Sequence, residues 1–252
     1  MREFGLIGRS LAHSFSPAYF AAKFAALGLV DHRYAPFELE SITELPALLA
    51  AHPRLAGLNV TIPYKEDVRA YLDELAPTAR RVGAVNTIAF ASDGRRIGHN
   101  TDLTGFDTAL TEFFALAATR VPPPARALIL GRGGAAKAVE VALKARGIPY
   151  LFVTRNPLAA GLAYTELSAS ILRHHRLIIN TTPVGTWPDV DACPDLPYAA
   201  LTPAHFLFDL VYNPVETEFM RRGQAAGATT CNGQRMLELQ ADAAWQIWNN
   251  EQ

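Results

Sequence analysis

The stretch ALILGRGGAAKAVEVALKARGIPYLFVTRN, residues 127–156, determines the fold expected for the second half of the chain. An apolar run reaches Gly131, a turn containing Gly133 and Gly134 follows, and a helical pattern then leads into the apolar run 150–153. A strand, a glycine-rich turn, a helix and a second strand in this order begin a dinucleotide-binding domain of the Rossmann type. The pattern therefore predicts a parallel α/β domain with a nucleotide site at its first turn.

The glycine-rich turn is the first candidate site. Glycine lets the backbone approach a pyrophosphate, and the N-terminus of the following helix offers free N–H groups. We therefore expect the cofactor to be bound by Gly131, Arg132, Gly133, Gly134 and Ala135. The spacing is GxGG rather than GxGxxG, and tight strand-to-helix turns need glycine for their own geometry, so a purely structural turn is the alternative.

The end of the second strand indicates which dinucleotide is bound. NAD sites place an acidic residue there to hold the ribose 2′-hydroxyl, whereas NADP needs a cation for its 2′-phosphate. This strand ends in Thr154, Arg155 and Asn156 without a carboxylate, which predicts NADP. The alternative for Arg155 is a solvated arginine at a strand end. Arg132 could also meet a phosphate, or it could point into solvent.

The first hundred residues also alternate between strands and helices. Apolar runs predict strands at 3–8, 32–37 and 55–60, with helices at 16–27 and 45–51 between them. Ser16 is expected at the N-cap of the first helix, Pro17 at its first position and Gly28 just past its end. Residues 84–91 and 96–100 flank the turn sequence SDGR and predict a hairpin. A mostly parallel sheet with an antiparallel margin follows from this pattern.

These patterns predict two α/β domains. Helical spacing continues over 102–116, and the proline-rich segment 119–126 is expected to be a linker. Further strands are expected within 176–182 and 205–212, and an amphipathic helix within 233–250. The expected boundaries place 102–232 in the cofactor domain, and 1–101 together with 233–252 in the other domain.

Polar side chains gather near the ends of the predicted N-terminal strands. Ser14 and Ser16 precede a helix N-terminus, where an anion such as a carboxylate is stabilised. The other groups are Asn59, Thr61 and Lys65, then Asn86 and Thr87, then Asn100, Thr101 and Asp102. Ligands of open α/β sheets bind outside the carboxyl ends of strands, so these groups could converge on one polyhydroxylated molecule. Each has a structural alternative, and the strongest is an inert ion pair between Lys65 and Asp102.

Composition narrows the class of partner. The chain has 252 residues, half of them hydrophobic, with 23 Lys plus Arg against 24 Asp plus Glu. This balance gives no electrostatic reason to expect a nucleic acid or a membrane surface, so a small-molecule substrate is expected. Cys193 and Cys231 show neither disulfide nor zinc spacing, and no metal site is expected. No signal peptide or membrane span is evident, which predicts a cytoplasmic protein. The sequence does not indicate the oligomeric state, and a monomer or homodimer is expected.

Eight motifs together resemble, in order and spacing, the shikimate dehydrogenase family. They are GLIGRSLAHSFSP, NVTIPYKE, GAVNTI, GHNTDLTGF, ILGRGGAAKAV, INTTPVG, DLVYNP and NGQRMLELQA. The resemblance runs from Gly5 to Trp248, and NVTIPYK followed by NTD is its most specific part. It implies a substrate-binding catalytic domain, a Rossmann-like NADP domain and an active site in the cleft between them.

The resemblance also implies a role for each matching residue. Lys65 matches the catalytic lysine, and Ser14 and Ser16 match the pair that holds the substrate carboxylate. The positions that match groups binding the ring hydroxyls and the reacting oxygen are Asn59, Thr61, Asn86 and Asp102. Gln240 and Tyr212 match residues near the substrate, and the chain is expected to return to the first domain near Gly233, which we assign to the cofactor site.

The implied reaction is the reversible, NADP-dependent reduction of 3-dehydroshikimate to shikimate, a step in aromatic amino acid biosynthesis. Two roles for Lys65 are open: it hands a proton to the oxygen, or it stabilises developing negative charge while Asp102 or water manages protons. The other hypotheses are a quinate-accepting relative, a lyase with Lys65 as Schiff-base nucleophile, and a non-catalytic NADP-binding regulator.

The chain departs from the family pattern in three places. Phe20 and Ala21 stand where the family often has histidine and asparagine, which puts contacts from that helix in question. The family's NRT cofactor motif appears as TRN at 154–156, keeping the central arginine. Arg132 stands where many relatives carry a small residue, and it adds positive charge beside the glycines.

Overall fold

The computed structural model describes residues 1–12, 14–117, 123–157 and 161–250, and it divides into two compact units. Unit 1 comprises Met1–Gly105 and Leu237–Gln252, and unit 2 comprises Phe106–Met236. Both divisions fall within helices, α4 (Thr101–Ala117) and α8 (Gln234–Asn250). The domain boundaries expected from the sequence, after residues 101 and 232, precede the observed divisions after 105 and 236 by four residues each.

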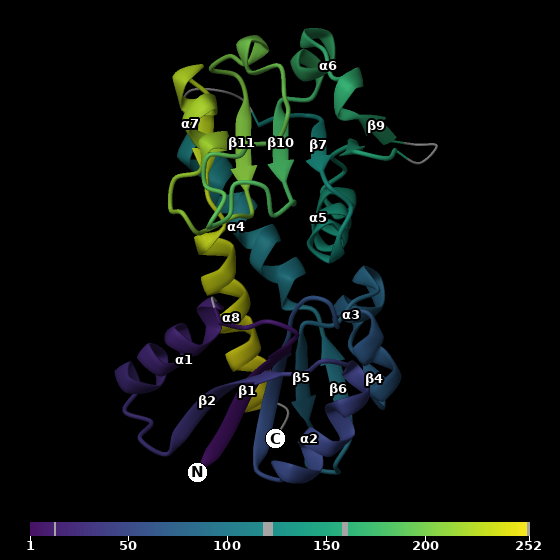
Figure 1. The fold of residues 1–252 in the computed structure, drawn as a ribbon, viewed down its shortest axis with the longest axis vertical. Helices are drawn as coiled ribbons and strands as arrows, with labels where there is room; N and C mark the ends of the chain where they lie inside the picture. The colour runs from purple at the N-terminus through teal and green to yellow at the C-terminus, as the bar shows by residue number, and fades with distance from the viewer. Residues whose placement is uncertain (13, 118–122, 158–160, 251–252) are drawn as a thin grey trace. The chain divides into compact units, whose positions relative to one another are not determined.

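Unit 1 contains a mixed sheet with the strand order β2-β1-β3-β5-β6-β4 among the described residues (Figure 1). Its strands are β1 (Arg2–Gly8), β2 (His32–Glu38), β3 (Leu55–Val60), β4 (Glu74–Leu75), β5 (Thr87–Phe90) and β6 (Arg96–His99). β1 pairs in parallel with β2 and β3, whereas β5 is antiparallel to β3 and β6. The predicted parallel core and antiparallel hairpin are confirmed. Two-residue β4, parallel to β6, was not predicted because it is too short to show a pattern.

The helices of unit 1 include those predicted at 16–27 and 45–51, and one at 77–82 that was not predicted. They are α1 (Phe15–Ala26), α2 (Leu45–Ala51) and α3 (Pro77–Val82), with the start of α4 and most of α8. The N-cap of α1 is Ser14, so the prediction of Ser16 at that position was wrong. Both serines can cap a helix, and Pro17 is tolerated anywhere in the first turn because the N–H it lacks would be unpaired there. Gly28 follows the helix with a φ of 66°, as expected.

An aromatic cluster attaches α8 to the sheet of unit 1. Phe4, Phe20 and Trp248 are each at most 1 % exposed, and Trp248 lies against both phenylalanines. Its indole Nε1 donates a 3.0 Å hydrogen bond to the carbonyl oxygen of Ile88. Glycine is required at Gly57, because a Cβ there would lie 2.3 Å from the indole ring. The end of the chain is therefore a structural part of the first unit.

Unit 2 contains a parallel sheet with the strand order β12-β11-β10-β7-β8-β9 among the described residues (Figure 1). Its strands are β7 (Ala127–Leu130), β8 (Tyr150–Thr154), β9 (Gly161–Ala163), β10 (Leu177–Asn180), β11 (Phe206–Asp209) and β12 (Thr229–Cys231). Besides most of α4 and the start of α8, its α-helices are α5 (Gly134–Ala145), α6 (Ala169–His174) and α7 (Glu218–Ala225). The strand, glycine turn, helix and strand predicted for 127–156 are confirmed.

Some sequence features need separate mention. Residues 119–122 of the expected proline linker lie outside the described residues. Short β9 and β12 were not predicted, because three residues are too few to show alternation. Both cysteines are free thiols. No helix within the described ranges has the length and apolarity needed to cross a membrane.

Candidate active site

Lys65 and Asp102 form an ion pair that is nearly closed to solvent. Lys65 Nζ lies 2.6 Å from Asp102 Oδ2, and the two side chains are 17 % and 5 % exposed. Lys65 follows the end of β3, and its carbonyl oxygen accepts a 2.7 Å bond from the N–H of Val85. Asp102 lies in the first turn of α4, where the helix dipole stabilises a carboxylate. The ammonium and carboxylate singled out in the sequence are therefore in direct contact.

Asn86 connects this pair to two other elements. Its Nδ2 lies 2.9 Å from Asp102 Oδ1, 3.0 Å from Thr101 Oγ1 and 3.1 Å from Gln240 Oε1. Its Oδ1 accepts a 2.7 Å bond from the N–H of Thr101. An amide NH₂ has two protons, so these three acceptors share them. Four predicted site residues, Lys65, Asn86, Asp102 and Gln240, are thus brought together within unit 1.

Asn59 is held by protein groups on both sides of its carboxamide. Its Oδ1 accepts a 2.8 Å bond from the hydroxyl of Tyr34, and its Nδ2 donates to Asn86 O and Thr87 Oγ1 at 3.2 and 3.1 Å. The Tyr34 ring stacks on Phe20 at 4.5 Å between centroids. Both amide protons of Asn59 are engaged, and one lone pair of its Oδ1 accepts the bond from Tyr34. The second lone pair of Oδ1 is therefore the group that Asn59 can offer a ligand.

Ser14, Ser16 and Thr61 follow the C-terminal ends of β1 and β3. Ser14 caps α1 by position, yet its hydroxyl accepts no capping hydrogen bond. Burial raises the pKa of the Tyr34 phenol, and a hydrogen bond with Ser16 acts in the opposite direction. The N–H of Thr61 donates to Ile7 O at 2.9 Å. These three half-buried side chains lie at the same edge of the sheet as Lys65.

The glycine turn of unit 2 is crowded at its first glycine and has open space beside the other two. Gly131 has a φ of 94°, and a Cβ there would lie 2.8 Å from Thr182 Cγ2. A Cβ at Gly133 or Gly134 would meet nothing within 4 Å. Gly133 is the N-cap of α5 and provides no side-chain cap, so the first N–H groups of the helix are left to other acceptors. Ala135 lies in the first turn of helix α5.

Arg132 and Arg155 emerge at matching positions of neighbouring strands. Leu130 of β7 pairs with Val153 of β8, and each arginine lies two residues beyond its strand's member of that pair. The Arg132 guanidinium lies 5.2 Å from the centre of the Phe152 ring. Within the described ranges neither arginine forms an ion pair with a carboxylate, and both are exposed. Thr154 ends β8, and Asn156 is exposed two residues later.

Comparison with known proteins identifies the family of the chain. The sequence model of the shikimate dehydrogenase substrate binding domain matches residues 6–88. A protein of Desulforamulus reducens named shikimate dehydrogenase (NADP(+)) is 38 % identical over 97 % of this chain and 88 % of its own length.

The chain belongs to the shikimate dehydrogenase family.

Two similar solved structures extend the comparison. The shikimate 5-dehydrogenase of Thermus thermophilus, in complex with NADP(H) and shikimate, has a TM-score of 0.82 and 35 % identity, covering 98 % of this chain and 93 % of that one. The quinate dehydrogenase of Corynebacterium glutamicum, in complex with NAD, has a TM-score of 0.83 and 28 % identity, covering 99 % and 94 %. Similarity to both structures does not distinguish shikimate from quinate, or NADP from NAD, for this chain. The residues of the site have to make that distinction.

The remaining predicted residues have different surroundings. Tyr212 is half-buried in the loop after β11, in unit 2. Gly233 donates its N–H to Val211 O at 3.0 Å, and a Cβ there would lie 2.1 Å from Leu210 O. This close backbone approach alone requires glycine, and a cofactor role for Gly233 stays a prediction. No three His, Cys, Asp or Glu residues of the described ranges are grouped as a metal site.

The departure from the family pattern in α1 has a packing explanation. Phe20, where the family often has histidine, is fully buried between Tyr34 and Trp248. Ala21 is exposed. Tyr34 was missed at the sequence level because a tyrosine in a strand is ordinary, and nothing in its neighbours indicates that it contacts Asn59.

A buried polar network in unit 2 was also missed. Asp209, fully buried at the end of β11, accepts hydrogen bonds from Asn180 Nδ2 at 2.9 Å, Thr217 Oγ1 at 2.7 Å and the N–H of Val211 at 3.0 Å. Burial raises the pKa of Asp209 to about 6, despite these bonds. The motifs INTTPVG and DLVYNP contain Asn180 and Asp209, but spacing alone does not show that they meet.

Asp209 should make stability depend on pH. Its pKa is about 6 in the folded chain and about 3.9 when unfolded, so folding favours the protonated form. This contribution to stability is present below the unfolded pKa and is lost as pH rises through 6. For Asp209→Asn, the stability difference from the wild type should change by roughly 1 kcal/mol between pH 5 and pH 7.5, in urea unfolding.

Asp191→Asn is the matched control, because the Asp191 side chain is 96 % exposed. Its difference from the wild type should stay constant over the same pH range. Parallel pH dependence in the wild type and Asp209→Asn would contradict the assignment.

Tyr34→Phe should destabilise unit 1, because Asn59 Oδ1 loses its donor in a buried position while the stack on Phe20 is kept. We expect the free energy of unfolding to fall by about 1–2 kcal/mol. Tyr71→Phe is the control, since the half-buried Tyr71 hydroxyl makes no hydrogen bond within the described ranges. Equal losses in the two variants would show that the bond from Tyr34 to Asn59 contributes nothing specific.

Proposed function

We propose that this chain catalyses the reversible, NADP-dependent reduction of 3-dehydroshikimate to shikimate. The observation that carries the proposal is the contact of Lys65 with Asp102 at 2.6 Å, joined through Asn86 to Gln240 in a nearly closed site. An inert surface ion pair would not be expected to lie inside such a network of ligand-type side chains. The hydroxyls of Ser14 and Thr61 at the same sheet edge weaken the inert-pair alternative further.

The substrate contacts follow from the donors that remain available. The Ser14 and Ser16 hydroxyls, at the N-terminus of α1, suit the substrate carboxylate, because the helix dipole stabilises an anion there. Thr61 and Gln240 suit ring hydroxyls. Asn86, whose two amide protons are shared by three protein acceptors, is proposed to hold Asp102 and Gln240 in position. Asn59 acts mainly by holding Asn86 and Thr87 in place, and Tyr212 is proposed as a further substrate contact.

Lys65 is proposed to act on the reacting oxygen. One ammonium proton is directed to Asp102, and the two others are available to the carbonyl oxygen of the substrate. The ammonium can therefore stabilise negative charge as it develops and pass a proton to the oxygen, with Asp102 holding it in position. Asp102 in turn is oriented by Asn86.

The residues of the glycine turn fit NADP. Space above Gly133 and Gly134, with the free N–H groups of α5, suits a pyrophosphate. Arg132 and Arg155 at adjacent strand ends, without carboxylate partners in the described ranges, suit a 2′-phosphate, flanked by Thr154 and Asn156. NADPH, when bound, supplies the hydride for the ketone carbon.

Lys65→Ala should lower kcat about 10²- to 10⁴-fold while KM for shikimate changes only a few-fold, because the lost interaction forms in the transition state. The measurement is NADPH formation from shikimate, followed by absorbance. The control is Lys144→Ala, which removes an exposed lysine that is paired with Glu140 on α5. Retention of kcat within a few-fold in Lys65→Ala would remove the catalytic assignment.

Arg155→Gln should lower kcat/KM for NADP⁺ at least about 10-fold and change kcat/KM for NAD⁺ only slightly, because a charge-assisted bond to the 2′-phosphate is lost. Arg173→Gln, an exposed arginine of α6, is the control. Equal losses with both dinucleotides, or a wild type that prefers NAD⁺, would exclude a 2′-phosphate contact.

One second candidate function has a specific observation behind it. Similarity to a quinate dehydrogenase makes quinate the alternative substrate, and the same assay with quinate in place of shikimate decides between them.

Borohydride trapping with a keto substrate would reveal a Schiff base on Lys65, and absence of any turnover would favour a regulator. We further propose that the protein acts as a cytoplasmic monomer or homodimer without a nucleic-acid or membrane partner.

A further inference from the structure

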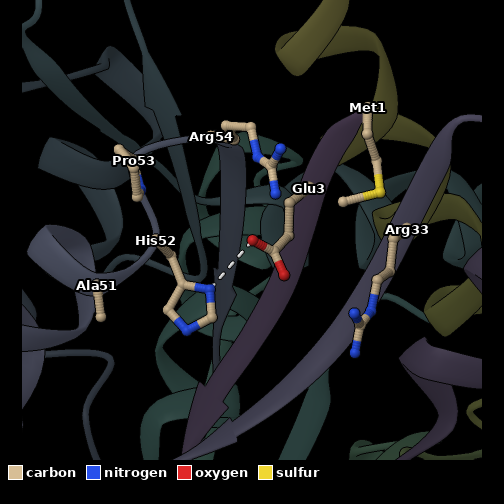
Figure 2. Close-up of a pocket in the computed structure, with 7 residues that line it drawn as sticks. All are labelled: Met1, Glu3, Arg33, Ala51, His52, Pro53 and Arg54. Carbon is tan, nitrogen blue, oxygen red and sulfur yellow. Dashed lines mark hydrogen bonds and ion pairs between the residues drawn. The ribbon is translucent and has the colours of Figure 1, made fainter.

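A pocket lies in unit 1, away from the candidate active site (Figure 2). It has a volume of about 600 Å³ and is lined by residues that include Met1, Glu3, Arg33, His52 and Arg54. These residues lie at the N-terminal ends of β1, β2 and β3, whereas Lys65 and Asn59 lie at or beyond the C-terminal end of β3. The pocket and the candidate active site are therefore at opposite ends of the strands of one sheet.

The pocket has an excess of positive charge. Arg33 and Arg54 make no ion pair or side-chain hydrogen bond within the described ranges, and both are exposed. Figure 2 shows the Glu3 carboxylate between His52 and Arg54 on one side and Arg33 on the other. His52 Nδ1 lies 3.1 Å from Glu3 Oε2, so the carboxylate that faces the pocket already has a partner.

The fold fixes the backbone positions of these residues. Glu3 and Arg33 are register partners on β1 and β2, and Glu3 is 8 % exposed. The N–H of Glu3 donates to Arg54 O at 3.3 Å, next to an irregularity in the pairing of β1 and β3. The His52 ring packs on Phe37 at 4.8 Å. Strand pairing and ring packing thus fix Glu3, His52 and the backbone of both arginines, and all four residues line one pocket.

We propose that this pocket binds a phosphate dianion, either free phosphate or the phosphate group of a small monoester. Each guanidinium offers a planar fork of N–H donors that matches phosphate oxygens, and two arginines match a double negative charge. The volume is within the range of small-molecule sites, which leaves room for an organic group beyond the phosphate. The ligand is not the substrate of the proposed dehydrogenase, because it binds at the other end of the strands.

The test is calorimetric titration of the full chain with glycerol phosphate, inorganic phosphate and malonate. Saturating NADP⁺ is present to fill the dinucleotide site, and the pH is about 8, where a phosphate monoester is a dianion. Arg33→Gln/Arg54→Gln should weaken glycerol phosphate binding at least about 10-fold, because two charge-assisted contacts are lost. Glu3→Gln should strengthen it several-fold, since a negative charge leaves the pocket.

Arg81→Gln, an exposed arginine of α3, is the matched control and should bind like the wild type. All variants should keep kcat/KM for shikimate in phosphate-free buffer, which shows that they fold. Tighter binding of glycerol phosphate than of inorganic phosphate identifies a monoester, and equal binding identifies free phosphate. Unchanged affinity in the double arginine variant, no binding to the wild type at about 10 mM, or preference for malonate would overturn the proposal.

Discussion

The hydrogen bonds of one carboxamide, that of Asn86, hold the candidate active site together. Its Nδ2 contacts the first turn of α4 through Thr101 and Asp102, and α8 through Gln240. The backbone carbonyl of Asn86 also accepts a bond from Asn59 on β3. Because Asn86, Thr101 and Asp102 are buried, a missing partner would leave a polar atom unsatisfied at a cost of about 1–3 kcal/mol. The network therefore favours one arrangement, which holds Asp102 beside Lys65.

The two units prepare their sites by different physical means. Unit 1 uses side chains whose positions are set by other side chains, as Tyr34 sets Asn59 and Asn86 sets Asp102. The turn of unit 2 instead exposes backbone N–H groups by omitting side chains at Gly133 and Gly134. The proposed substrate site therefore depends on long-range hydrogen bonds, whereas the proposed cofactor site depends largely on the local geometry of one turn and two arginines.

Sequence reasoning worked where the signal was local. The strands of 127–156, the hairpin around SDGR and the helix 45–51 were predicted, because periodicity and turn residues lie within a few positions of one another. The same reasoning placed the N-cap of α1 at Ser16, because Pro17 favours the first helical position, whereas the helix begins at Phe15 and Pro17 is its third residue. It gave no indication that Tyr34 bonds to Asn59 or that Asp209 is fully buried beside Thr217.

The sequence by itself determined the type and order of the main elements, the glycine turn, and the family to which the chain belongs. The tertiary structure decided which polar side chains meet. Asn86 and Gln240 are 154 positions apart, and Lys65 and Asp102 are 37 apart, so no local pattern records their contact. Strand register and the packing of Trp248 on Gly57 bring such residues together, and both depend on the whole unit being folded.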